Sequence, residues 1–208
     1  YIPYDEDKGA SESWKEVKRY NTDGKPYLLC RCGHSGSKPF CDSTHYVEGF
    51  SGEEIADRTP YDEAAKIYET PAFTLMDRED LCAVARFCDL GMGAWKFAFK
   101  SDDPSNAAMA RKLAMACPSG RLTVRTHEGE KLEPELAQEI YVSEDIEEGY
   151  QGPLYVKGGI EVESTDGTSY EVRNRVTLCR CGESKNIPFC DSSQPRCERM
   201  KMDGEKYS

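Results

Sequence analysis

Apolar and polar residues alternate toward both ends of the chain, a pattern typical of β-strands that are buried on one face. Near the C-terminus the alternation covers residues 153–157, 159–163 and 169–178, with Gly158-Gly159 and Asp166-Gly167 as turn signals. These segments predict an antiparallel meander. Near the N-terminus, residues 14–20 and 25–29 flank Asp23-Gly24 and predict a single hairpin.

The centre of the chain has a different pattern. Residues 61–69, 78–88 and 105–117 are rich in Ala and have helical spacing, and Asp103 before Pro104 offers a helix cap. We therefore expect an α+β protein in which a mainly helical insert, residues 56–130, separates two small β-rich modules, residues 1–55 and 131–208.

The chain contains an internal repeat. Residues 29–43 align without gaps on residues 178–192, and 11 of the 15 positions are identical, the differences falling at 34, 36, 37 and 38. Two copies are too few for a solenoid. The repeat predicts two equivalent sites built into one chain.

Cysteines dominate both copies. Six of the ten cysteines form two tight groups, and in each group the first two are separated by one residue. Neighbours so close bridge poorly to each other, so the grouping favours metal ligands in a reducing compartment over disulfides. The groups are Cys30, Cys32 and Cys41, and Cys179, Cys181 and Cys190.

The first group is extended by His45, four residues after Cys41. Asp42 can cap a short helix that carries this histidine. Three thiolates and one imidazole suit either a tetrahedral zinc ion or a 2Fe–2S cluster. Structural zinc sites usually use cysteines about two to four residues apart, so the spacing of Cys30 and Cys32 leans toward iron.

This run resembles the CDGSH iron–sulfur domain family, the mitoNEET-like proteins. It fits C-x-C-x2-(S/T)-x3-P-x-C-D-G-x-H at every position except Ser43, which replaces the Gly. The resemblance implies a 2Fe–2S cluster held by Cys30, Cys32, Cys41 and His45. The whole chain is similar to bacterial CDGSH proteins in which two motifs flank a ferredoxin-like insert. Members of the family resemble homodimers, so two motifs in one chain imply a monomer with an internal pseudo-two-fold.

The second copy departs from the family pattern at the histidine position. Cys179, Cys181 and Cys190 match, but Gln194 stands where the family has His. Three outcomes are open at this site. Gln194 binds weakly, Cys197 supplies a fourth thiolate, or the site is capped by solvent or empty. We expect two clusters per chain, with Gln194 among the candidate ligands.

The insert has three cysteines of its own, Cys82, Cys88 and Cys117. The sequence Cys117-Pro-Ser-Gly resembles the tail of a divergent single-cluster ferredoxin domain. A 4Fe–4S cluster normally needs four thiolates. We therefore expect a ferredoxin-like shell without metal, in which these cysteines act as small buried hydrophobic residues.

Charge and composition exclude several classes of protein. The net charge of −11 argues against nucleic-acid binding, and no apolar run is long enough to span a membrane. No basic and apolar leader is visible, so a cytoplasmic location is expected. Nucleotide-binding, nucleophile-elbow and zinc-protease patterns are absent from the sequence, so we expect no enzyme.

These observations predict electron transfer, cluster transfer or redox sensing by an iron–sulfur protein. Replacing a thiolate with a neutral imidazole removes negative charge and raises the reduction potential. Protonation of a histidine ligand would also release iron at low pH. Expected partners are redox or cluster-acceptor proteins with basic surfaces. A zinc-stabilised interaction module is the alternative, and a thiol sensor using Cys82, Cys88 and Cys117 is a third hypothesis.

Overall fold

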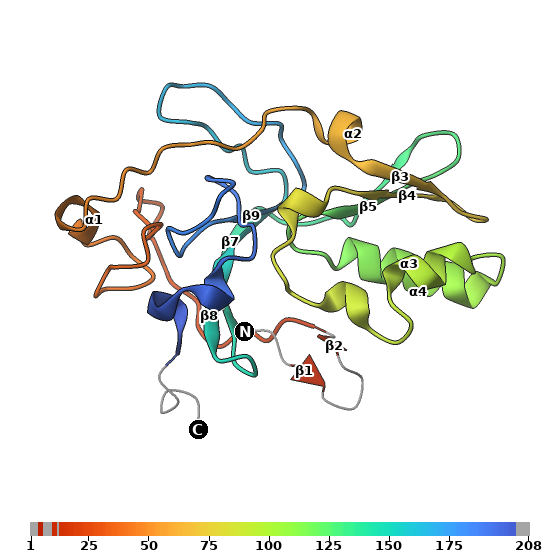
Figure 1. Cartoon of the computed structure of the whole chain (residues 1–208), viewed down its shortest axis with the longest axis horizontal. Coiled ribbons are helices and arrows are strands. Elements are labelled where there is room, and N and C mark those ends of the chain that lie inside the picture. The colour runs from red at the N-terminus through yellow and green to blue at the C-terminus, as the bar shows by residue number, and fades with distance from the viewer. Residues whose placement is uncertain (1–3, 6–9, 12, 203–208) are drawn as a thin grey trace.

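The structure is a computed structural model, and it describes residues 4–5, 10–11 and 13–202. The fold is α+β, as expected from the sequence. Figure 1 shows the first motif beside α1 at one end of the molecule and the insert at the other, with the second motif between them. The elements outside the insert are β1 (Tyr4–Asp5), β2 (Ala10–Ser11), α1 (Thr44–Val47), β7 (Glu139–Asp145), β8 (Tyr150–Lys157) and β9 (Arg175–Leu178).

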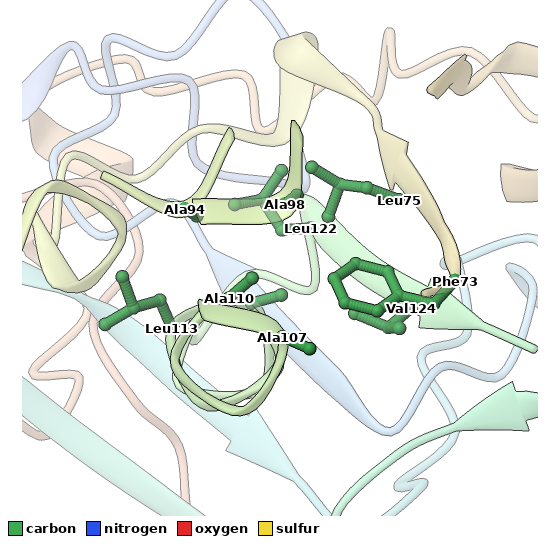
Figure 2. Close-up of a cluster of buried hydrophobic side chains, with 10 residues drawn as sticks. Phe73, Leu75, Ala94, Ala98, Ala107, Ala110, Leu113, Leu122 and Val124 are labelled. Atoms are coloured by element: carbon green, nitrogen blue, oxygen red, sulfur yellow. The ribbon is translucent and has the colours of Figure 1, made fainter. Parts of the chain in front are cut away.

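The insert is built on a four-stranded antiparallel sheet. Its strands lie side by side in chain order, and β4 is buried along its whole length. Helices α3 and α4 pack on one face, where Ala98 and Ala110 face Phe73, Leu75 and Leu122 (Figure 2). The elements are α2 (Tyr61–Ala64), β3 (Lys66–Glu69), β4 (Thr74–Asp77), α3 (Ala94–Phe99), α4 (Pro104–Met115), β5 (Leu122–Arg125) and β6 (Lys131–Leu132).

The expectation of a mainly helical insert needs correction. The predicted helix at 105–117 is confirmed by α4, where the Asp103 carboxylate accepts from the Ser105 N–H at 2.7 Å. Residues 61–69 instead form the single turn α2 and then β3, because β3 completes the sheet beside the buried β4. Residues 78–88 contain the 3-10 turn Glu79–Leu81 and the start of a second one, Phe87–Asp89, but no α-helix. Val84 and Arg86 have φ values of 53° and 60°, which no right-handed helix accommodates.

The C-terminal sheet is an antiparallel meander, β7–β8–β9. The predicted strands at 153–157 and 169–178 correspond to parts of β8 and β9, whereas 159–163 contributes only the bridge between Glu163 and Ser169. Strand β7 was not predicted. The N-terminal hairpin prediction is wrong: within the described residues 13–29 only Leu29 makes a β-bridge, to Phe40. Most of this segment is exposed, whereas Trp14 packs on Tyr141 of β7 and Tyr155 of β8.

A second core joins the insert to the C-terminal sheet. Met76 and Leu81 of the insert pack with Val156, Val176 and Phe189. Arg175 of β9, 2% exposed, also reaches into the insert, where its guanidinium donates to the carbonyls of Ala114 and Cys117 at the end of α4. These carbonyls carry the negative end of the helix dipole, so the buried cation stabilises them. The second motif therefore rests on the insert through shared packing.

Two absences concern the described part of the chain. No helix there is long and apolar enough to cross a membrane. All ten cysteines lie within it, and none of them forms a disulfide. The disulfide reading of the even cysteine count thus has no support in the structure.

Candidate metal centres

The two motifs have the same backbone arrangement. In each, the residue before the first cysteine bridges to the phenylalanine before the third, Leu29 to Phe40 and Leu178 to Phe189. A buried serine hydroxyl donates to that phenylalanine's carbonyl at 2.7 Å in both copies. The X-Pro bond within each motif is cis. The repeat in sequence is therefore a repeat in structure.

An aspartate organises the loop that carries the fourth candidate ligand. The Asp42 carboxylate accepts from Thr44 Oγ1 and N–H and from the Gly36 N–H, and these bonds lower its pKa to about 2. Asp191 accepts the equivalent hydrogen bonds in the second motif. Partial burial raises its pKa, but hydrogen bonds from Ser193 and the Lys185 N–H outweigh burial, and the pKa is lowered.

At the first site the candidate ligands lie in two pairs. The sulfurs of Cys30 and Cys32 are 3.8 Å apart, and Cys41 Sγ lies 3.5 Å from His45 Nδ1. The first pair is buried, whereas Cys41 and His45 are partly exposed. His45 is carried by α1, beside the exposed Tyr46. One side of this site therefore faces solvent.

The second site repeats the pairs in a closed setting. The sulfurs of Cys179 and Cys181 are 3.6 Å apart, and Cys190 Sγ lies 3.2 Å from Gln194 Oε1. All four side chains are buried, with Gln194 only 2% exposed. The Gln194 amide nitrogen donates to the Ala83 carbonyl of the insert at 3.0 Å. Gln194 thus takes the place that His45 has at the first site.

Three of the four pairs have distances that suit two donors on one tetrahedral metal, whereas the 3.2 Å between Cys190 and Gln194 is shorter and is that of a thiol hydrogen bond. Two donors on one such metal lie about 3.5–3.8 Å apart, given metal–sulfur bonds of about 2.3 Å and metal–nitrogen bonds of about 2.0 Å. Across residues 4–5, 10–11 and 13–202, no group of three or more His, Cys, Asp or Glu side chains could hold one metal ion. The donors are therefore arranged two by two.

Backbone amides surround the sulfurs. The N–H groups of Ser43 and Ser192 point at Cys41 and Cys190, with N···S distances of 3.4 and 3.5 Å. Such bonds favour a thiolate over a thiol and tune a bound metal. Without metal, a hydrogen bond from Cys181 lowers the pKa of Cys179 to about 6, and burial raises the pKa of Cys190.

The two motifs contact each other directly. The Arg31 guanidinium, from between Cys30 and Cys32, donates to the carbonyls of Cys179 and Pro188, the latter at 2.7 Å. A Cβ on Gly33 would lie 2.9 Å from the Cys181 carbonyl oxygen, and one on Gly182 would lie 2.8 Å from that of Cys32. The close approach is thus reciprocal and requires glycine on both sides.

Among the other candidate ligands, Cys197 lies beside the second site. Its sulfur is 3.8 Å from the Cys181 carbonyl oxygen, and its side chain packs with Cys179, Cys181 and Met200. In the insert, the Cys88 thiol donates to Asp89 at 3.6 Å and Cys117 lies beside Ser119 at 3.4 Å.

Sequence reasoning missed two contributors to the sites. One is Arg31, which a clue in the sequence could have flagged: an arginine stands between the first two cysteines in both copies. The other is the Ala83 carbonyl, a backbone group with no signal in the residue types.

Comparison with known proteins identifies three segments. Residues 2–46 and 151–193 match the family model described as iron-binding zinc finger of CDGSH type. Residues 68–127 match the model described as divergent 4Fe–4S mono-cluster. No curated protein and no solved structure matches the chain significantly.

Proposed function

The chain carries two CDGSH-type iron-binding segments around a divergent ferredoxin-type segment, and from this premise we propose that it holds two 2Fe–2S clusters. Cys30, Cys32, Cys41 and His45 would hold the first. Cys179, Cys181, Cys190 and Gln194 would hold the second. A bound cluster supplies one-electron redox chemistry. The chain would act as a carrier of electrons or of whole clusters rather than as an enzyme.

The two-by-two arrangement of donors carries this proposal. A zinc ion needs four donors converging on one point. In the described chain the donors form pairs. The two donors of a pair lie 3.8 and 3.5 Å apart at the first site, and 3.6 and 3.2 Å apart at the second. A binuclear cluster takes one pair on each iron, so the pairs favour 2Fe–2S over a zinc-stabilised module.

The surface at the first site supports exchange with a partner. His45 stands beside Tyr46 and Val47, which are 80% and 87% exposed. Exposed apolar side chains beside a metal site are typical of a contact surface. The formal charge of −11 favours basic partners, so redox or cluster-acceptor proteins with basic surfaces are the expected class. The reciprocal glycine contacts favour an internal pseudo-two-fold and hence a monomer.

The test is an absorption spectrum with metal and acid-labile sulfide counts on freshly purified protein. We expect a brown protein with about four iron and four sulfide atoms per chain. About two of each would limit the proposal to one site. A colourless protein that contains zinc would overturn it.

A further inference from the structure

The insert does not fit the cluster that its family match suggests. A 4Fe–4S cluster normally takes four thiolates, and residues 68–127 contain only Cys82, Cys88 and Cys117. In the described chain these cysteines join no group able to hold a metal ion. Cys88 and Cys117 pack against the insert's apolar core instead, and burial raises the pKa of Cys88. A protonated thiol is a poor ligand.

The loop between two of these cysteines, residues 82–88, lies against the second motif. The Ala83 carbonyl accepts the amide hydrogen of Gln194, and both residues are buried. A carbonyl can only accept, so it selects the NH2 end of the Gln194 amide. The oxygen end must then face Cys190, 3.2 Å away. This matters because an amide binds metal through oxygen, and a flipped Gln194 would present NH2 to the site.

The 82–88 loop is held in a conformation that it would not adopt alone. Val84 and Arg86 both have left-handed backbone angles, which are unfavourable above all for a β-branched residue. The Arg86 guanidinium forms an ion pair with Asp145 of β7 at 2.7 Å, and Asp145 is 2% exposed. Phe87 packs against Trp14 with ring centroids 5.4 Å apart and ring planes tilted by 40°. These contacts fix the loop against the C-terminal sheet.

We propose that the 82–88 loop, which lies within the ferredoxin-type segment, is the clamp that positions Gln194 as the fourth ligand of the second site. The Ala83 carbonyl sets the direction of the amide, and Arg86 is the positioning residue that anchors the loop to Asp145. The inference rests on the proposed function, because it assigns the insert to the second cluster. It predicts that changes in the 82–88 loop alter the stability and the paramagnetic signal of the second cluster and leave those of the first unchanged.

The test compares Arg86→Gln with Arg86→Lys and with a control, Lys157→Gln. Lys157 forms an ion pair with Glu139 at 2.8 Å, at the opposite end of β7 from Asp145. Cluster loss to an iron chelator is followed by visible absorbance. The phase belonging to each site is identified with Cys41→Ala and Cys190→Ala. Electron paramagnetic resonance of the reduced protein reports the ligands of each cluster.

We expect Arg86→Gln to accelerate loss of the second cluster about tenfold, because a buried hydrogen bond that orients its ligand is weakened. The paramagnetic signal of that site should also change. Arg86→Lys should keep the loss rate and the second-site signal close to those of wild type, and Lys157→Gln should alter neither. An Arg86→Gln protein whose second-site signal and loss rate equal those of wild type would overturn the clamp.

A backbone variant covers the case in which Arg86→Gln does not fold. Replacing Val84 with the corresponding α-hydroxy acid turns the Ala83 carbonyl into an ester carbonyl, a weaker acceptor. The Val84 N–H that is lost makes no hydrogen bond with any described residue. The second-site signal should again change, and an unaltered signal would count against the clamp.

The two proposals fail in different ways. A wild-type protein with about two irons per chain, lost in Cys41→Ala but kept in Cys190→Ala, would show that the second cluster is absent, and the proposed function of that site would fail. The other outcome is a wild-type protein with about four irons and an ester variant whose second-site signal is unchanged. That result would leave both clusters in place and overturn only the clamp.

Discussion

The first and second sites share a backbone and differ in what covers them. At the first site, Cys41 and His45 are partly exposed, and α1 presents Tyr46 and Val47 to solvent. At the second, Cys190 and Gln194 are 3% and 2% exposed, and the insert lies over them through Ala83. The first site therefore lies at the surface, and the second lies in the interior.

The difference follows from the neighbours of each motif and not from the motif. Solvent exposure and surrounding hydrogen bonds set how a metal site exchanges electrons and ligands. We propose the exposed site as the contact point for partners. The buried site has a neutral amide whose orientation is set by another part of the chain. The contrast indicates a division of labour that variants can test.

The largest expected effect comes from the arginine that joins the sites. Arg31 donates to two carbonyls of the second motif, whereas Arg180, its counterpart, donates to Gln151 of β8 at 2.7 Å. Arg31→Gln should cost about 3 kcal/mol of unfolding free energy, because two partly buried carbonyls lose a charged donor. Thermal unfolding of the iron-loaded protein measures this cost. Chelator kinetics show whether cluster loss is accelerated at one site or at both.

Arg180→Gln is the matched control for this prediction. It should accelerate cluster loss at the second site alone, whereas Arg31→Gln should do so at both. If Arg31→Gln affected the first site only, the motifs would be energetically independent despite their contact.

The next effect concerns charge at the exposed site. His45→Cys replaces a neutral donor with a thiolate, and added negative charge disfavours reduction. The first-site potential should fall by at least about 100 mV, or about 2.3 kcal/mol for one electron. Spectroelectrochemical titration should show the second-site potential nearly unmoved. A fall of equal size at both sites would show that His45 does not belong to the first cluster alone.

Local features of the chain were predicted better than contacts between distant segments. Cys30, Cys32, Cys41 and His45 were grouped from their spacing, and the structure places them in two close pairs, because ligand spacing is local. That they bind iron stays a prediction. The helix at 105–117 was also found, because its cap and periodicity are local.

The failures arose where distant segments decide the structure. Residues 66–69 become the edge strand of a sheet in which β4 also pairs with β5, at 122–125, and their Ala-rich context gave no sign of it. Residues 14–29 alternate like a hairpin but pair with no strand there, and Trp14 instead packs on Tyr155 of β8. The burial of Gln194 depends on Ala83, 111 positions away in the chain, and no pattern of residue types reports such a contact.

A smaller effect should separate the sites by access. With an iron chelator at neutral pH, we expect two phases of cluster loss, the first site losing iron about tenfold faster, or about 1.4 kcal/mol in barrier. The physical reason is the partial exposure of Cys41 and His45 against the burial of Cys190 and Gln194. Cys41→Ala should remove the fast phase. Equal rates at the two sites would show that burial does not control release.

The smallest effect comes from two serines with left-handed backbone angles. Ser43 and Ser192, with φ of 70° and 66°, stand where the CDGSH pattern has glycine, the residue that adopts this angle without strain. Ser43→Gly should therefore raise the unfolding free energy by about 0.5–1 kcal/mol. Ser192→Gly should gain less, because the Ser192 hydroxyl donates to the Asp191 carbonyl at 2.5 Å whereas Ser43 makes no side-chain cap bond. Ser43→Ala keeps the strain and is the control. Thermal unfolding of the loaded protein measures all three, and an equal gain from Gly and Ala would assign the effect to the lost hydroxyl and not to the backbone.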